Sequence, residues 1–129
     1  MNNTAENLTA FRAFTQGFFD ELRPVGIVEQ QLVRRLADTS WRLNRVTPQE
    51  NNLLAMGFPG QDEIRHQDPK VRAALVEAGT FRANLEAFEA LSVHGDCLSR
   101  QFEAILRQLS RLQANRRRNS RAQAEPAVI

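Results

Sequence analysis

Residues 85–112, LEAFEALSVHGDCLSRQFEAILRQLSRL, decide the fold, because their apolar side chains recur at alternating spacings of three and four over about four heptads. The members of this apolar seam are Leu85, Phe88, Leu91, Gly95, Leu98, Phe102, Ile105, Leu109 and Leu112. The pattern predicts a straight helix on the order of 50 Å long, counting about 1.5 Å for each residue. Such a helix needs a partner along its whole length.

A second helix of similar length is predicted to begin near Ile27, and its inner face is broad. That face comprises Val28, Leu32, Val33, Leu36, Ala37, Ser40, Leu43 and Val46, with Trp41 at its border. Thr47 and Pro48 are typical of a fresh helix start, so we expect a kink near Pro48. The two long helices are expected to pack as an antiparallel hairpin.

A first helix is predicted from Thr4 to Leu22, with Asn3 as its cap and the residues Arg23 to Gly26, which include Pro24, ending it. Its phenylalanines, Phe11, Phe14 and Phe18 among them, recur at helical spacing and are expected to pack in the core. With the hairpin, this helix completes the predicted fold class, an all-α three-helix up-down bundle.

The stretch from Gly57 to Asp68 lacks apolar periodicity and is predicted to be an exposed loop. Asp68 and Pro69 are typical of a helix start, and a short amphipathic helix is expected to end near Gly79. Its apolar positions are Val71, Ala74, Leu75 and Ala78. After Gln113 the apolar pattern stops, which predicts a helical domain over residues 1–113 and a basic, disordered tail over residues 114–129.

The composition is that of one ordinary globular domain, with 129 residues, 42% apolar and 25% charged, and a formal net charge of +2. Cys97 is the single cysteine, so no internal disulfide can form, which favours a reducing compartment. The sequence shows no leader peptide pattern and no apolar run of about 18 residues that could cross a bilayer. A cytoplasmic location without membrane contact is therefore expected.

The residue types that carry catalysis or bind metals form no convincing set. His94 and Cys97 lie three apart on one predicted helix, but zinc needs three or four ligands, and His66 and Asp68 belong to the exposed loop. A thiol nucleophile assisted by His94 and Asp96 lacks an oxyanion hole and a cleft. We expect no catalytic, cofactor or metal site, no small-molecule substrate and no enzymatic activity.

Arginines crowd the end of the chain and form the one candidate binding site in the sequence. They are Arg116, Arg117, Arg118 and Arg121. Each could neutralise a backbone phosphate without reading sequence, but no helix-turn-helix spacing, zinc-finger ligand set or aromatic sheet accompanies them. A solvated tail whose cations complement the helix dipole is the alternative.

Two stretches resemble an uncharacterised family of small bacterial helical proteins. The first runs from Glu21 through Pro24 and Glu29 to Arg45, and the second covers Phe88 to Gln113, the family's closing helix. Many members carry an Asn-Ala-Leu-Lys-His-Gly-Leu segment before the first stretch, and residues 2–8 of this chain show nothing like it. The resemblance implies a bacterial, cytoplasmic helical protein and carries no catalytic role across.

Two functions remain open from the sequence. The first is a non-enzymatic helical interaction or scaffold protein that binds a protein partner or a second copy, because the seam is longer than the first helix can cover. The alternative is an accessory nucleic-acid-binding protein that uses the arginine cluster.

Overall fold

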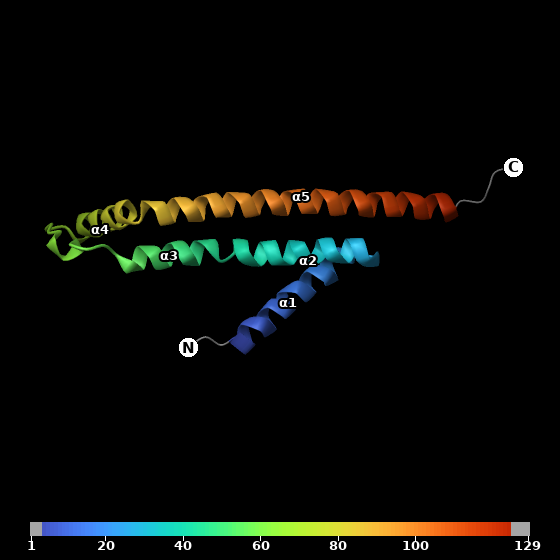
Figure 1. The fold of residues 1–129 in the computed structure, drawn as a ribbon, viewed down its shortest axis with the longest axis horizontal. Coiled ribbons are helices and arrows are strands. Elements are labelled where there is room, and N and C mark those ends of the chain that lie inside the picture. The colour runs from blue at the N-terminus through green and yellow to red at the C-terminus, as the bar shows by residue number, and fades with distance from the viewer. Residues whose placement is uncertain (1–3, 125–129) are drawn as a thin grey trace. The chain divides into compact units, whose positions relative to one another are not determined.

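The computed structural model describes residues 4–124, and within that range the regular structure is helical, with no strand. The all-α prediction is confirmed. The helices are α1 (Thr4–Leu22), α2 (Gly26–Leu43), α3 (Val46–Met56), the short 3₁₀ turn η1 (Gln61–Glu63), α4 (Pro69–Ala83) and α5 (Leu85–Ala124) (Figure 1). The bounds of α1 agree with those predicted from the sequence, whereas the predicted cap Asn3 lies outside the described residues.

The chain divides into two compact units. We call Met1–Arg42 with Leu98–Ile129 the terminal unit, and Leu43–Cys97 the middle unit. The terminal unit holds α1, α2 and the later part of α5, while the middle unit holds α3, η1, α4 and the start of α5.

The core of the terminal unit joins three helices. Its buried members are Leu32, Val33 and Leu36 of α2 with Ile105 and Leu109 of α5. Phe18, Phe19 and Leu22 of α1 pack against them, together with Phe102 and Leu112 of α5. Burying each large apolar side chain contributes roughly 1.5–3 kcal/mol. The second half of the predicted seam on α5 is therefore shielded within this unit.

The aromatic side chains near the start of α1 pack on Trp41 of α2. The ring of Phe11 meets Trp41 edge-on at a centroid distance of 5.3 Å, and Phe14 does so at 5.4 Å. All three side chains are half-buried. This confirms that the phenylalanines of α1 and Trp41 are packing residues.

The break between α2 and α3 lies at Asn44 and Arg45, slightly before the kink predicted at Pro48. Pro48 has no N–H to donate to the carbonyl of Asn44, and its ring would clash with that carbonyl in a continuous helix. The helix therefore breaks one turn before the proline. Gln49 N–H then donates to Arg45 O at 3.1 Å as α3 begins.

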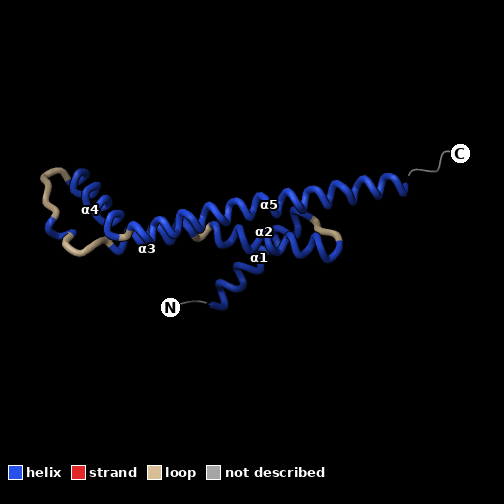
Figure 2. The backbone as a smooth tube through the Cα atoms, turned by 45° about the horizontal axis from the view of Figure 1, so that its top comes forward, coloured by secondary structure: helices blue, strands red, loops and turns tan. Residues whose placement is uncertain are grey.

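In the middle unit, Gly79 allows close packing, because a Cβ at this position would lie 2.5 Å from the Phe58 ring. A Cβ at Gly95 would lie 3.5 Å from Val46 Cγ1, which is an ordinary contact. Phe58 belongs to the connection between α3 and α4, which Figure 2 draws largely as loop on either side of η1. The predicted start of α4 is confirmed, because Asp68 Oδ1 accepts the Lys70 N–H at 2.9 Å.

Two predicted helix ends are wrong. α4 continues past Gly79 to Ala83, because Gly79 is held against Phe58 and serves as a contact rather than as a stop. α5 continues past Gln113 to Ala124, so residues 114–124 are helical and the disordered tail predicted there is corrected. Arginine, alanine and glutamine are good helix formers, and polar contacts of Gln113 and Arg116 hold this segment. Residues 125–129 lie outside the described range.

Candidate functional site

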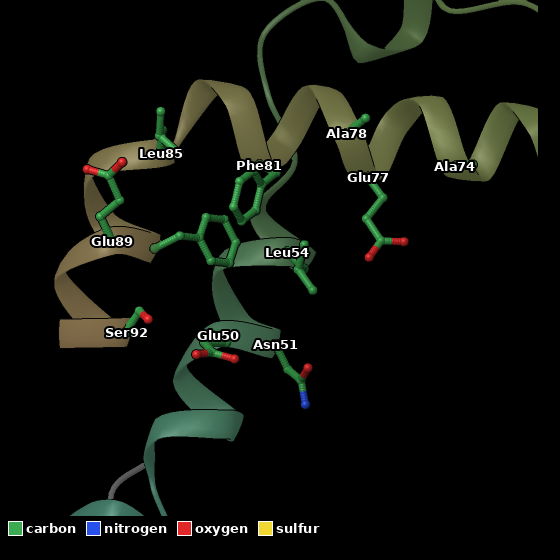
Figure 3. Close-up of a pocket in the computed structure, with 11 residues that line it drawn as sticks. Glu50, Asn51, Leu54, Ala74, Glu77, Ala78, Phe81, Leu85, Glu89 and Ser92 are labelled. Carbon is green, nitrogen blue, oxygen red and sulfur yellow. The ribbon is translucent and has the colours of Figure 1, made fainter. Parts of the chain in front are cut away.

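The middle unit carries an open apolar groove formed by α3, α4 and the start of α5, with a volume of about 840 Å³ (Figure 3). We call it the acidic groove. Its apolar part is lined by Leu54, Ala74, Ala78, Phe81, Leu85 and Phe88. Its polar part is lined by Glu50, Asn51, Glu77, Glu89 and Ser92.

The apolar stripe of α4 that the sequence pattern contains runs beside the groove, and its later members, Ala78 and Phe81, line it. Val71 and Leu75 are followed on the same side of the helix by Ala78, Phe81 and then Leu85. The structure leaves these large side chains open to solvent: Phe81 is 49% exposed, Leu75 45% and Leu85 42%. α4 therefore presents apolar surface that no described part of the chain covers.

The opposite side of α4 makes the contacts that hold the helix in the unit. Thr80 is fully buried, and its Oγ1 donates to Val76 O at 2.9 Å. Asn84, at the junction of α4 and α5, donates its side-chain amide to Thr80 O at 2.8 Å and to Gly57 O at 3.4 Å. Because the burial of Thr80 and the hydrogen bond from Asn84 to Gly57 O favour this orientation, the apolar stripe is left facing outward.

The floor of the groove is built around two stacked rings. Phe81 and Phe88 lie 4.9 Å apart between ring centroids with 29° between their planes. Phe88 is 8% exposed, so the partly exposed Phe81 rests on a buried aromatic base. In Figure 3 the Phe81 side chain points from α4 into the space above Leu54. The groove thus offers a preformed aromatic anchor point.

The charged side chains that line the groove are all acidic. Glu50 comes from α3, Glu77 from α4 and Glu89 from α5, and no arginine or lysine lines the groove. The middle unit as a whole has eight acidic residues against five cationic ones. A ligand carrying positive charge beside apolar groups is complementary to this surface.

A second, smaller groove lies in the terminal unit between α1 and α5. Its volume is about 460 Å³, and its lining is apolar except for Glu21. Phe14, Phe18, Leu36 and Phe102 are among its walls. Leu36 belongs to the core, Phe18 and Phe102 pack on it, and the Phe14 ring lies 5.2 Å from that of Phe18, so this groove is the solvent-facing edge of the core.

The four arginines predicted as a nucleic-acid site do not act together. Arg116 is turned toward α2, where its guanidinium donates to both carboxylate oxygens of Glu29, at 2.9 and 3.3 Å. Arg117, Arg118 and Arg121 are exposed on the helical end of α5. Arg118 also donates a hydrogen bond to Asn115 Oδ1. Arg116 thus joins α5 to α2, and the other three arginines of the predicted set are exposed.

Glu29 is the buried acidic member of this ion pair, with a side chain only 7% exposed. The hydrogen bond from Arg116 holds the pKa of Glu29 below its ordinary value, against the effect of burial, which raises it. The backbone N–H of Val25 and the side chain of Gln113 lower this pKa further. The pair therefore joins the start of α2 to α5 in the charged form.

The residues weighed as metal ligands or as a catalytic set form no centre. Within residues 4–124, no group of three or more His, Cys, Asp and Glu side chains is placed to hold a metal ion. His94 and Cys97 lie on the exposed side of α5. His66 Nδ1 accepts the Asp68 N–H at 3.0 Å, which makes this pair part of the turn before α4.

No family model, curated protein or solved structure matches this chain. The resemblance to the bacterial helical family therefore stays a prediction from the sequence. None of the described helices is long and apolar enough to cross a membrane.

The sequence contains the elements of the acidic groove, yet apolar periodicity alone does not identify a groove. The spacing of Val71, Ala74, Leu75 and Ala78 predicts an amphipathic helix that ends near Gly79. A second apolar pair, Phe81 and Leu85, continues the same stripe beyond the predicted helix end. A second side of the same helix, which includes Thr80, was the signal in the sequence that the apolar side of α4 need not be the side that packs in the core.

Proposed function

We propose that the protein is a non-enzymatic interaction protein whose middle unit binds an amphipathic helix of a partner in the acidic groove. One observation carries the proposal: the apolar stripe of α4 and its continuation to Leu85 are exposed beside a groove lined by carboxylates. A soluble monomer rarely exposes contiguous apolar side chains without a binding role. A helix laid in a groove is a common solution to this arrangement.

The energetic gain is concentrated on two large apolar side chains that line the groove. Phe81 is 49% exposed and Leu85 is 42% exposed. Covering the remaining surface of each would contribute on the order of 1 kcal/mol, half of the value for full burial. Phe81 would be the anchor, since aromatic residues at the centre of an interface dominate binding.

Charge selects the partner. Three glutamates surround the apolar floor, so a helix bearing arginine or lysine beside its apolar stripe is favoured over an acidic one. A second copy of this chain is less complementary as occupant, because the large apolar side chains on the arginine-rich part of its α5 belong chiefly to the core of the terminal unit. We therefore commit to a cationic amphipathic helix of another protein.

The test uses the full chain and a fluorescein-labelled synthetic helix with leucine on one face and lysine on the other. Its anisotropy is followed on titration with wild type, Phe81→Ser and Val93→Ser. Val93 is the matched control, since it is 66% exposed in the middle unit and lies outside the groove. The Phe81 variant should lose about tenfold in affinity or more, equal to about 1.4 kcal/mol, and the control should stay near wild type.

Equal binding by wild type and Phe81→Ser contradicts the proposal, as does equal binding of a helix with glutamate in place of lysine. Light scattering of the chain alone measures its oligomeric state and so tests whether a second copy occupies the groove. A dimer that Phe81→Ser converts to a monomer would assign the groove to a second copy and overturn a separate partner.

We also infer that the terminal unit is an up-down three-helix bundle. Support comes from contacts at both ends: Glu29 of α2 meets Arg116 of α5, whereas Leu36 lines the same groove as Phe102. Residue numbers thus rise along α2 as they fall along α5. Trp41 near the end of α2 meets Phe11 near the start of α1. A cytoplasmic location and the bacterial family remain proposals that rest on the sequence.

A further inference from the structure

Five arginines lie on one side of the terminal-unit part of α5. They are Arg100, Arg107, Arg111, Arg118 and Arg121, and all are exposed. At about 100° per residue they fall within an arc of about 80°. The buried seam residues Leu98, Ile105 and Leu109 lie on the opposite side of the helix. We call this set the arginine face.

The arginine face is poor in compensating charge. Glu103, which lies on the same side between Arg100 and Arg107, is the one acidic residue of α5 beyond Leu98. From Arg107 to Arg121, α5 carries no acidic residue. Within residues 4–124, none of the five arginines is in an ion pair. Arg107 and Arg111 are four apart, and Arg118 and Arg121 are three apart, so each pair repels at a cost of about 0.2–0.5 kcal/mol. A face meant only for solvation would more commonly alternate the two signs.

The fold holds this face rigid. Arg116 is fixed to Glu29, and Gln113 Nε2 donates to Leu22 O at 2.8 Å, so α5 is tied to α1 and α2 near its end. The seam packs beneath the helix along the same stretch. From Arg100 to Arg121 the face is about 32 Å long at 1.5 Å per residue. That is close to one turn of duplex DNA, about 34 Å.

We propose that the arginine face binds the phosphate backbone of double-stranded nucleic acid without reading its sequence. The inference goes beyond the proposed function, since it concerns another unit and a ligand of opposite charge. The terminal unit has twelve arginines against seven acidic residues, so its field attracts a polyanion. Guanidinium groups pair well with phosphate oxygens.

The residue types on and around the arginine face favour a duplex as ligand over an anionic membrane or a single strand. A helix that lies in a membrane interface needs large apolar side chains next to its cations, and those of this stretch of α5 belong chiefly to the seam. Single strands are held mainly by stacking on aromatic rings, and the aromatic residue of this stretch, Phe102, packs on the core. Binding to the phosphates of a duplex requires neither exposed apolar side chains nor exposed aromatic rings.

The test is fluorescence anisotropy of a labelled duplex of random sequence with the full chain at several salt concentrations. The face variant is Arg107→Gln with Arg111→Gln and Arg118→Gln. A control with the same change in charge, Arg65→Gln with Lys70→Gln and Arg82→Gln, lies in the middle unit, where all three residues are exposed. Circular dichroism verifies that each variant is folded.

We expect wild type to bind at low salt, with a slope of log K against log salt that the face variant reduces by about 2.7, or about 0.9 for each lost contact. The control should keep the wild-type slope, and replacing the same three arginines by lysine should keep binding within a few-fold. Equal losses in both triple variants, or no binding at low salt, would overturn the proposal. Tighter binding to anionic vesicles or to a single strand than to the duplex would also overturn it.

Discussion

The guanidinium of Arg116 donates two hydrogen bonds to the buried carboxylate of Glu29, which also accepts the backbone N–H of Val25 at 3.2 Å. The two residues are 87 positions apart in the sequence. This pair joins the first turn of α2 to the part of α5 that the sequence pattern assigned to an irregular tail. Several properties of the terminal unit therefore depend on it.

Removing one partner of the pair should cost more than neutralising both. Arg116→Met leaves the Glu29 carboxylate buried and unpaired, and we expect it to lower the free energy of unfolding by about 3 kcal/mol. Adding Glu29→Gln should recover about half of that loss, since the amide is neutral and its oxygen can still accept from Val25. Urea unfolding followed by circular dichroism measures both. A double variant less stable than Arg116→Met would contradict this account.

Acid should weaken the same contact. The folded-state pKa of Glu29 is lowered chiefly by the Arg116 hydrogen bond, so its stabilisation is complete above the unfolded pKa, about 4.3, and is lost as pH falls through the folded value. Glu29→Gln has no such group. Below about pH 4.3 the stability of wild type should therefore fall more steeply than that of Glu29→Gln. Parallel pH profiles of the two proteins would exclude a lowered pKa at Glu29.

Truncation tests the extent of α5. A chain cut after Gln113 loses Arg116, and we expect a loss of about 3 kcal/mol in the free energy of unfolding, as for Arg116→Met. A chain cut after Arg118 keeps the pair and should lose little of that stability. Thermal unfolding of the two truncated chains makes the comparison. If both are as stable as the full chain, residues after Gln113 are a dispensable tail after all.

The single tryptophan reports on the packing of α1. Phe14 contacts Trp41 at 5.4 Å and is half-buried, so Phe14→Ala should cost about 2 kcal/mol and let water reach the indole. The emission maximum of Trp41 should then move to longer wavelength in the folded protein. Leu8→Ala, a change at a side chain that is 49% exposed, serves as the control. An unchanged spectrum for Phe14→Ala would mean that α1 does not shield Trp41.

Local rules predicted much of the fold from particular residues. The Asp68–Pro69 start of α4 follows from capping chemistry, which acts within one turn. Buried positions on α5, including Leu98, Ile105 and Leu109, follow from apolar spacing. The break before α3 was predicted one turn late, because the clash of a proline falls on the carbonyl four residues before it.

The remaining features depend on contacts between distant residues. Gly79 is a helix-ending signal in sequence, yet Phe58 packs against it and α4 continues. Residues after Gln113 have no apolar pattern, and a buried glutamate near the start of the chain holds them in the helix. The acidic groove needs α3, α4 and α5 together, and periodicity cannot tell an exposed apolar stripe from a buried one.

The decisive measurement for the groove is a ¹⁵N–¹H correlation spectrum of the full chain, recorded while an unlabelled leucine-lysine helix is added. We predict that the shifted amides cluster around Leu54, Ala78, Phe81 and Leu85, and that Phe81→Ser abolishes these shifts. Shifts confined to α1 and α2, or a spectrum that does not change at saturating peptide, would contradict a partner-binding role for the acidic groove.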